Sequence, residues 1–184
     1  VKIATLTGRY FAMDRDNRWD RVQKAFDVMV RADGPSFGSA AAGVQAANDA
    51  GKTDEFVEPF FLDDYAGMVD GDGVFFINFR SDRAREILAA IGDPAFDGFD
   101  AGTRPELSSI LGMVKYSDTH DTYMTTVFPK RTIPNTLGEW VSKQGKRQFR
   151  LAETEKYPHV TFFLNGGVEV PYDGEDRFMP ASPK

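Results

Sequence analysis

The sequence predicts an α/β protein, and three observations carry the prediction. The apolar run Val1 to Leu6 is followed by a charged turn and then by Trp19 to Ala32, whose apolar residues have helical spacing. The same order of strand, charged turn and helix returns with Val74 to Phe79 and Arg83 to Ile91. With 184 residues, 41% of them hydrophobic and 13% aromatic, the chain is also long enough to bury a sizeable core.

Composition excludes several classes of protein. The 22 basic and 28 acidic residues give a net charge of -6, which opposes non-specific binding to nucleic acid or to anionic membranes. Neither is therefore expected as a partner. The chain has no cysteine, which excludes a disulfide framework, a thiolate metal site and a cysteine nucleophile.

Two further features bear on location and extent. No segment approaches the roughly 18 consecutive apolar residues of a membrane span, and the amino end has no basic region followed by an apolar signal core. We therefore expect a globular, cytoplasmic protein. Because the sequence starts at Val1, inside a predicted strand, and stops at Lys184 without a closing element, we expect a piece of a longer protein.

The first half of the chain alternates between helices and strands. Asp16 or Asn17 is the expected cap of the helix Trp19 to Ala32, which Gly34 and Pro35 would stop. Alanine-rich Ser39 to Ala50 is a second predicted helix, and Gly51 would end it. Glu55 to Leu62 has β character, and Pro59 favours an edge strand or an extended approach to a loop.

The next elements surround a second anchoring strand. Val74 to Phe79 is continuously apolar, as in the interior of a sheet, and the glycine-rich and proline-rich residues 92–103 form a loop. Leu111 to Tyr116 is a probable strand. Ser117 to Arg131 is polar and irregular, and it is the candidate linker.

Beyond the linker the pattern changes. Thr136 and Glu139 have the spacing of a capping box that opens a helix through Gln144. A strand, Gln148 to Ala152, follows. Tyr157 to Leu164 fits either a helix or a strand, and helix is favoured because two glycines follow it. The tail is a loop with one short strand near Arg177 to Met179.

The charged turns are the leading candidate for a binding site. Gly8 to Arg21 contains four arginines in fourteen residues, and Asn78 to Arg83 occupies the same place after a strand. A guanidinium presents a planar fork of donors that matches two oxygens of a phosphate or carboxylate. The expected ligand is a small phosphorylated acid, held by Arg9, Arg15, Arg80 and Arg83. The alternative is that these arginines pair with neighbouring aspartates on a wet surface.

Other polar groups carry weaker signals. Lys156 lies near the carboxyl end of a predicted strand and could add a fifth cationic contact. The aspartates at 63, 64, 70 and 72 are interpreted as turn residues that accept backbone hydrogen bonds rather than as metal ligands. His120 is expected in a solvated loop and His159 as a hydrogen-bonded packing residue. With only these two histidines and no serine in a nucleophile elbow, neither a histidine-rich metal site nor a triad is predicted.

Three long segments closely resemble a known family. Gly8 to Arg21, Asn78 to Arg83 and Ala152 to Gly167 are similar to cofactor-independent phosphoglycerate mutase, of the alkaline phosphatase superfamily, and the resemblance runs from Val1 to Lys184. It implies part of the substrate-binding (phosphotransferase) α/β domain, followed by the return segment into the alkaline-phosphatase-like domain. The expected boundaries are 1–130 for the substrate-binding part and 131–184 for the linker and the incomplete return segment.

The resemblance also implies an activity. The family interconverts 2-phosphoglycerate and 3-phosphoglycerate, a glycolytic isomerisation, through a phosphoserine intermediate at a site with two manganese ions. By motif, Arg9, Arg15, Arg80, Arg83 and Lys156 correspond to its substrate contacts. The parent protein is expected to be a monomeric enzyme.

The motifs for the nucleophilic serine and for the manganese ligands are not found in these 184 residues. The chain alone is therefore expected to have no catalytic residues, to bind no metal and to be inactive, while the parent is an isomerase. The alternative is a non-catalytic phosphate-binding or interaction module.

Overall fold

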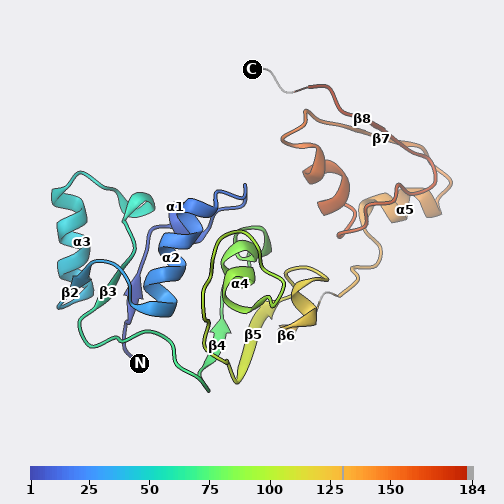
Figure 1. Ribbon diagram of the computed structural model, residues 1–184. Helices are drawn as coiled ribbons and strands as arrows, with labels where there is room; N and C mark the ends of the chain where they lie inside the picture. Colours follow the sequence, from blue (N-terminus) through green and yellow to red (C-terminus); the bar gives the residue numbers. More distant parts are fainter. Residues whose placement is uncertain (130, 182–184) are drawn as a thin grey trace. The chain divides into compact units, whose positions relative to one another are not determined.

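The computed structural model describes residues 1–129 and 131–181. Residue 130 of the predicted linker and residues 182–184 of the predicted tail lie outside the described residues. The chain divides into two compact units, Val1–Pro129 and Lys130–Lys184 (Figure 1). The assignment of 1–130 and 131–184 to a substrate-binding part and a return segment stays a prediction.

The first unit alternates between strands and helices, so the α/β prediction is confirmed. Its strands are β1 (Thr5–Leu6), β2 (Ser36–Phe37), β3 (Phe60–Leu62), β4 (Gly73–Phe76), β5 (Ser109–Val114) and β6 (Thr125–Phe128). Its α-helices are α1 (Arg9–Ala12), α2 (Trp19–Arg31), α3 (Ala40–Asp49) and α4 (Arg85–Gly92). Its 3₁₀ turns are η1 (Asp54–Phe56), η2 (Ser81–Arg83) and η3 (His120–Thr122).

The strands of the first unit form two sheets. In one, β3 lies between β1, to which it is antiparallel, and β2, to which it is parallel. In the other, β4, β5 and β6 are all parallel, in that order. Parallel neighbours need a crossover connection, and α4 provides it between β4 and β5.

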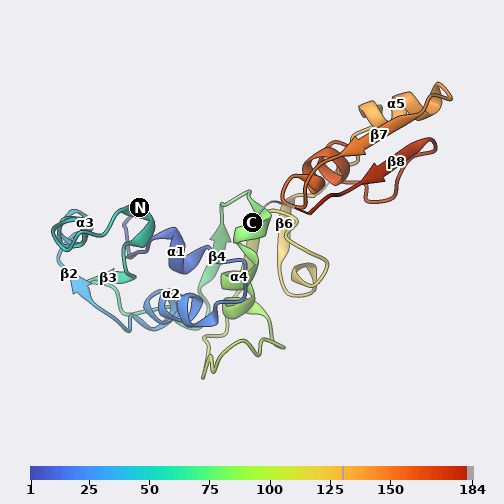
Figure 2. The ribbon, with the colours of Figure 1, turned by 90° about the horizontal axis from the view of Figure 1, so that it is seen from above.

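Helix α4 is buried on two sides. Its Ile87 and Ile91 pack with Phe26 of α2 in one apolar cluster, while its Leu88 packs with Ile110 of β5 in another. Figure 1 and Figure 2 both show α2 and α4 next to each other. Helix α4 follows the second charged turn and packs against α2, which follows the first. The packing of the two helices therefore brings the two turns near each other.

The prediction of an edge strand near Pro59 is wrong, because β3 is the central strand of its sheet. Pro59 lies one residue before β3 begins, so its missing N–H does not interrupt the pairing of Phe60 with Leu6 or of Phe61 with Ser36. A proline at the entry of a strand leaves the ladder intact.

The prediction that Val74 to Phe79 lies in the interior of a sheet is also wrong. Strand β4 is at the edge of its sheet. Phe75 of the strand is 56% exposed, and Ile77, directly after the strand, is 68% exposed. Val74 and Phe76 are partly buried against the α4 side of the sheet. A continuous apolar run cannot reveal that only one face of the strand is covered.

The irregular segment predicted from Ser117 to Arg131 contains an unpredicted strand. Thr125, Thr126 and Phe128 of β6 pair with Leu111, Gly112 and Val114 of β5. Threonine, valine and phenylalanine suit a strand, and the long-range pairing with β5 determines the outcome. Residues Thr125–Phe128 therefore belong to a sheet of the first unit and not to a linker.

Helix α2 has the predicted extent but not the predicted cap. Arg18 is its N-cap residue and makes no side-chain capping bond, whereas Asn17 has a left-handed backbone with φ of 57°. Asn is among the few residues with a side chain that adopt this conformation readily. At the other end, Ala32 already has a left-handed conformation, before the predicted stop at Gly34.

The second unit contains α5 (Leu137–Lys143), β7 (Gln148–Leu151), a π-helix (His159–Phe163) and β8 (Glu175–Phe178). The predicted cap is confirmed, because Thr136 Oγ1 accepts the Glu139 N–H at 3.4 Å. Strands β7 and β8 are parallel and lie side by side (Figure 1). The predicted helix at Tyr157 to Leu164 is confirmed, although its central turn is a π-helix.

Both histidine predictions need correction. His159 is exposed and its ring contacts Phe163. His120 is 5% exposed rather than solvated: its Nε2 lies 3.0 Å from the Arg85 carbonyl oxygen and its Nδ1 lies 2.7 Å from Ser117 Oγ. A carbonyl only accepts, so Nε2 carries the proton of the neutral ring. Burial lowers the pKa of His120 below its ordinary value of 6.5.

In residues 1–129 and 131–181, no helix combines the length and the apolar character that crossing a membrane requires.

Stability should depend on pH through His120. A lowered folded-state pKa means that the stabilisation is present above pH 6.5 and is lost as pH falls through the folded pKa. The first unit should therefore be less stable at pH 5 than at pH 7, and His120→Gln should reduce that difference. Urea unfolding followed by Trp19 fluorescence in a Trp140→Phe background reports this unit alone.

His159→Gln is the matched control, since His159 is exposed and belongs to the second unit. An equal pH dependence in the His120 variant and the unmodified chain would contradict the assignment.

Candidate functional site

The first charged turn begins where β1 ends. Gly8 follows the strand and approaches the backbone of η1 so closely that a Cβ atom there would lie 2.4 Å from the Glu55 carbonyl oxygen. Only glycine fits this approach. The Gly8 N–H also donates to the Val57 carbonyl at 2.8 Å. These contacts place the start of α1, and with it Arg9, beside η1.

Asp14 organises the rest of this turn. It is 5% exposed, and its Oδ2 accepts the backbone N–H groups of Asp16 at 2.9 Å and Arg18 at 3.0 Å. Arg18 lies 3.4 Å and Arg21 3.7 Å from Oδ1. Burial raises the pKa of Asp14, but the backbone donors, Glu86 and the Arg18 charge together outweigh burial and the pKa falls below the ordinary 3.8. The carboxylate thus holds the loop that carries Arg15.

The second charged turn follows β4. The Asn78 side chain accepts the Arg80 N–H at 2.9 Å, and the buried Tyr116 donates its hydroxyl to the Asn78 carbonyl. Residues Ser81–Arg83 then form η2, from which α4 starts. Tyr116, a buried residue shortly after β5, therefore holds this turn in place through its hydroxyl.

The two turns are in contact. Arg15 Nη1 lies 3.0 Å from Asp82 Oδ2, and Arg80 Nε lies 3.1 Å from Asp82 Oδ1, so both guanidiniums converge on one carboxylate. Arg83 Nη1 donates to the Met13 carbonyl at 3.0 Å. Burial raises the pKa of Asp82, but the hydrogen bonds from Arg15 and Arg80 outweigh burial and lower it below 3.8.

The arginines differ in how available they are. The side chains of Arg15 and Arg80 are 49% and 64% exposed, so both can reach a ligand from solvent. Arg83 is half-buried, and its Nη1 already donates a hydrogen bond to the Met13 carbonyl. The structure therefore brings Arg15, Arg80 and Arg83 together around Asp82 and the Met13 carbonyl.

Two predicted residues stand apart from this group in their contacts. Arg9 Nη2 pairs with Glu55 Oε2 at 2.9 Å, on the η1 side of α1. Lys156 belongs to the second unit, where its Nζ lies 3.2 Å from Glu155 Oε1. Their participation in a site with the other arginines stays a prediction.

Sequence reasoning missed three acidic residues of this region. The surface-charge alternative included Asp14, whereas Asp82 had no role of its own; in the structure Asp14 holds the first turn and Asp82 contacts both turns. Glu86 was not considered. It was detectable, because it lies four residues before Ala90 on the buried face of α4, where a carboxylate interrupts an apolar pattern.

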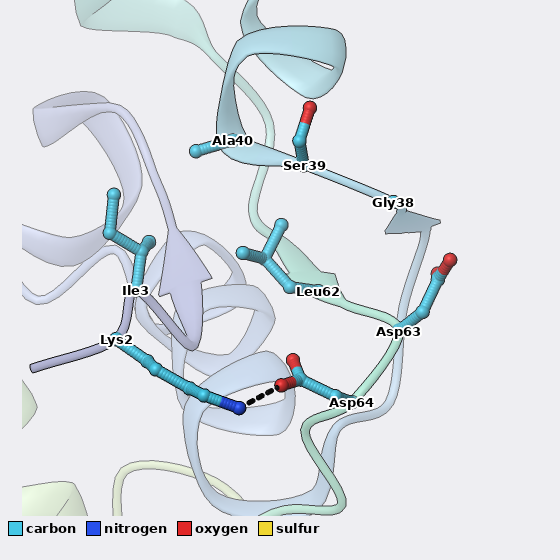
Figure 3. Close-up of a pocket in the computed structure, with 8 residues that line it drawn as sticks. All are labelled: Lys2, Ile3, Gly38, Ser39, Ala40, Leu62, Asp63 and Asp64. Carbon is cyan, nitrogen blue, oxygen red and sulfur yellow. Dashed lines mark hydrogen bonds and ion pairs between the residues drawn. The ribbon is translucent and has the colours of Figure 1, made fainter.

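A separate pocket of about 430 Å³ opens where β2 and β3 end and α3 begins (Figure 3). Ser39 caps α3 there by accepting the Ala42 N–H at 3.2 Å, and Lys2 forms an ion pair with Asp64 at 2.9 Å. None of the five predicted binding residues lines this pocket.

The aspartates at 70 and 72 accept backbone hydrogen bonds, as predicted, from Glu106 at 2.8 Å and Val69 at 2.9 Å. Among the described residues, no three His, Asp or Glu side chains gather in a way that could hold a metal ion. The chemistry that the described arginines of the two turns offer is electrostatic attraction of an anion.

Two arginine-bearing turns in contact, each between a strand and a helix, define an α/β protein with guanidiniums gathered at the carboxyl ends of its strands, an arrangement suited to an anion. The model of the BPG-independent PGAM N-terminus family matches residues 1–118. The chain belongs to this family.

Relatives agree with this assignment. The chain is 63% identical to the 2,3-bisphosphoglycerate-independent phosphoglycerate mutase of Paracoccus denitrificans and 64% identical to that of Dinoroseobacter shibae. Each match covers 100% of this chain and 36% of the relative, so the chain spans about a third of their length. A Leishmania mexicana phosphoglycerate mutase structure, determined at low cobalt concentration, matches with a TM-score of 0.71 and 28% identity over 99% of this chain and 35% of that one.

Asp14→Ala should destabilise the first unit by about 2 kcal/mol, because two charge-assisted backbone bonds are lost and exposed donors are partly compensated by water. Asp16→Ala is the matched control. Asp16 is an exposed partner of Arg18, so its loss should cost about 0–0.5 kcal/mol. Urea midpoints from Trp19 fluorescence in the Trp140→Phe background measure both, and equal midpoints would contradict the role given to Asp14.

Proposed function

We propose that this protein binds a phosphoglycerate through Arg9, Arg15, Arg80 and Arg83, as the substrate-gripping part of a 2,3-bisphosphoglycerate-independent phosphoglycerate mutase. The observation that carries the proposal is the convergence of Arg15 and Arg80 on Asp82. Family membership and the names of the relatives support the choice of ligand. A phosphoglycerate carries a phosphate and a carboxylate, and each suits the fork of an arginine.

Energetic magnitudes favour the ligand over the internal ion pairs. An exposed ion pair such as Arg15 with Asp82 contributes about 0–1 kcal/mol. A charge-assisted bond to a bound anion contributes about 1.5–3 kcal/mol. Asp82 therefore keeps the two guanidiniums oriented before binding, and a bidentate anion can compete with it for their donors.

The proposed role is positioning. In a mutase that exchanges a phosphoryl group between two hydroxyls, the glycerate must be held while its hydroxyls are presented in turn. Fixed guanidiniums supply that hold and offset the negative charge of the substrate. Lys156 is proposed as a further cationic contact to the phosphoryl group.

We propose metal chemistry only for full-length proteins of this family. Two manganese ions are the family expectation for the full-length enzyme, while the described residues of this chain offer no cluster that fits a metal. No step is therefore assigned to a metal on these residues.

Arg80→Ala should weaken binding of 3-phosphoglycerate by about 10-fold or more, since it removes a charge-assisted contact of about 1.5–3 kcal/mol. Isothermal titration of the 184-residue chain measures this directly. Glycerol 3-phosphate, which lacks the carboxylate, should bind more weakly than 3-phosphoglycerate to the unmodified chain.

Arg147→Ala is the matched control, because Arg147 is an 84% exposed arginine that pairs with Asp176 in the second unit. The affinity of the Arg147→Ala variant for 3-phosphoglycerate should be unchanged. Equal losses in the two variants would mean that only overall charge matters and would refute the site.

The chain alone should show no turnover of 3-phosphoglycerate with manganese present, because the motifs for the nucleophile and the metal ligands are not found in it. A coupled assay for 2-phosphoglycerate, with the full-length Paracoccus denitrificans relative as positive control, tests this. Turnover that Arg80→Ala abolishes would show that the chain contains the catalytic apparatus.

A further inference from the structure

Glu86 is a buried carboxylate at the junction of the two arginine turns. It lies in the first turn of α4, is 8% exposed, and its Oε1 accepts the Asn17 N–H at 3.0 Å. Its second oxygen, Oε2, is buried without a hydrogen-bond partner. A buried charged oxygen of this kind costs free energy, so its position needs a reason.

The backbone of Asn17 is shaped for this contact. With φ of 57°, Asn17 is the left-handed residue of the turn that Asp14 closes, and this conformation directs its N–H to α4. The side chains of Asp14 and Glu86 are neighbours and interact directly.

The neighbouring charges act on the pKa of Glu86 in the same direction as burial. Burial raises the pKa of Glu86 above its ordinary value of 4.5, the negative charges of Asp14 and Asp16 raise it further, and the Asn17 N–H opposes them. Asp14, with two backbone donors and two arginines nearby, keeps the negative charge.

Three polar links described above join the two turns. Two of them use proposed substrate arginines, namely Arg15 with Asp82 and Arg83 with the Met13 carbonyl. A bound anion would compete for both. The link from Asn17 to Glu86 uses no guanidinium, so it persists when the arginines turn to a ligand.

We propose that Glu86 is a positioning residue for the anion site: through the Asn17 N–H and the Asp14 carboxylate it holds the Arg15 turn against α4, so that Arg15 and Arg80 meet one ligand together. This inference rests on the proposed function. Arg15 is 49% exposed, so the place of its guanidinium depends on the turn that Glu86 holds, whereas Arg80 lies on the turn that Asn78 and Tyr116 hold.

The test is titration of the 184-residue chain with 3-phosphoglycerate. Glu86→Ala removes the acceptor for Asn17 and should weaken binding about 10-fold. Glu86→Gln keeps a carbonyl acceptor for Asn17 and offers Asp14 an N–H donor, so its affinity should stay within about twofold of the unmodified chain. Glu106→Ala, an exposed glutamate of the same unit, should not change affinity.

Amide hydrogen exchange and the arginine Nε–H resonances provide a readout independent of ligand. In Glu86→Ala, the Asn17 amide should lose its protection from exchange, and the Arg15 Nε–H resonance should move to the chemical shift of a free arginine. Both signals should return to their original values in Glu86→Gln. Unchanged affinity and unchanged Asn17 protection in the folded Glu86→Ala variant would overturn the inference while leaving the proposed function intact.

If Glu86→Ala does not fold, Glu86→Gln decides: a 10-fold loss there would refute the inference, because the hydrogen-bonding pattern is retained. If the unmodified chain does not bind 3-phosphoglycerate, the proposed function fails first and the inference fails with it.

Discussion

The burial of α4 on two sides is the constraint on which the arginine turns depend. One face packs on α2 and the other on β5, so the helix cannot shift without opening one of two apolar clusters. The turn bearing Arg80 leads into this helix, and the turn bearing Arg15 is bonded to it through Glu86. Packing in the core thus determines where two exposed guanidiniums lie.

The polar contacts at the turns separate into two kinds. Asp14 and Glu86 are almost fully buried and form bonds with backbone N–H groups, which keep the loop shape independent of solvent and salt. Asp82 is partly exposed and contacts only arginine side chains within this group. The buried Asp14 and Glu86 therefore stabilise the backbone of the turns, while the partly exposed Asp82 orients guanidinium donors that a ligand could bind.

Much of this architecture follows from local patterns. The repeated order of strand, charged turn and helix predicted that Arg15 and Arg80 occupy similar places, and Thr136 with Glu139 predicted the start of α5. Long-range packing decided the rest. Whether Val74 to Phe79 is central or at an edge depends on its neighbours. The buried role of Glu86 depends on Asn17 lying opposite it, and that of His120 depends on the Arg85 carbonyl. The contacts of Arg9 with Glu55 likewise come from segments far apart in the sequence.

The exposed side of β4 has a consequence for handling the isolated chain. An edge strand that exposes Phe75 and is followed by the exposed Ile77 presents one unpaired side of its backbone beside large apolar side chains. That combination is a template on which another strand can add, and natural sheets usually protect it with charges, a bulge or a covering segment. We expect the purified chain to self-associate through this edge as its concentration rises, so quantitative binding measurements belong at low protein concentration.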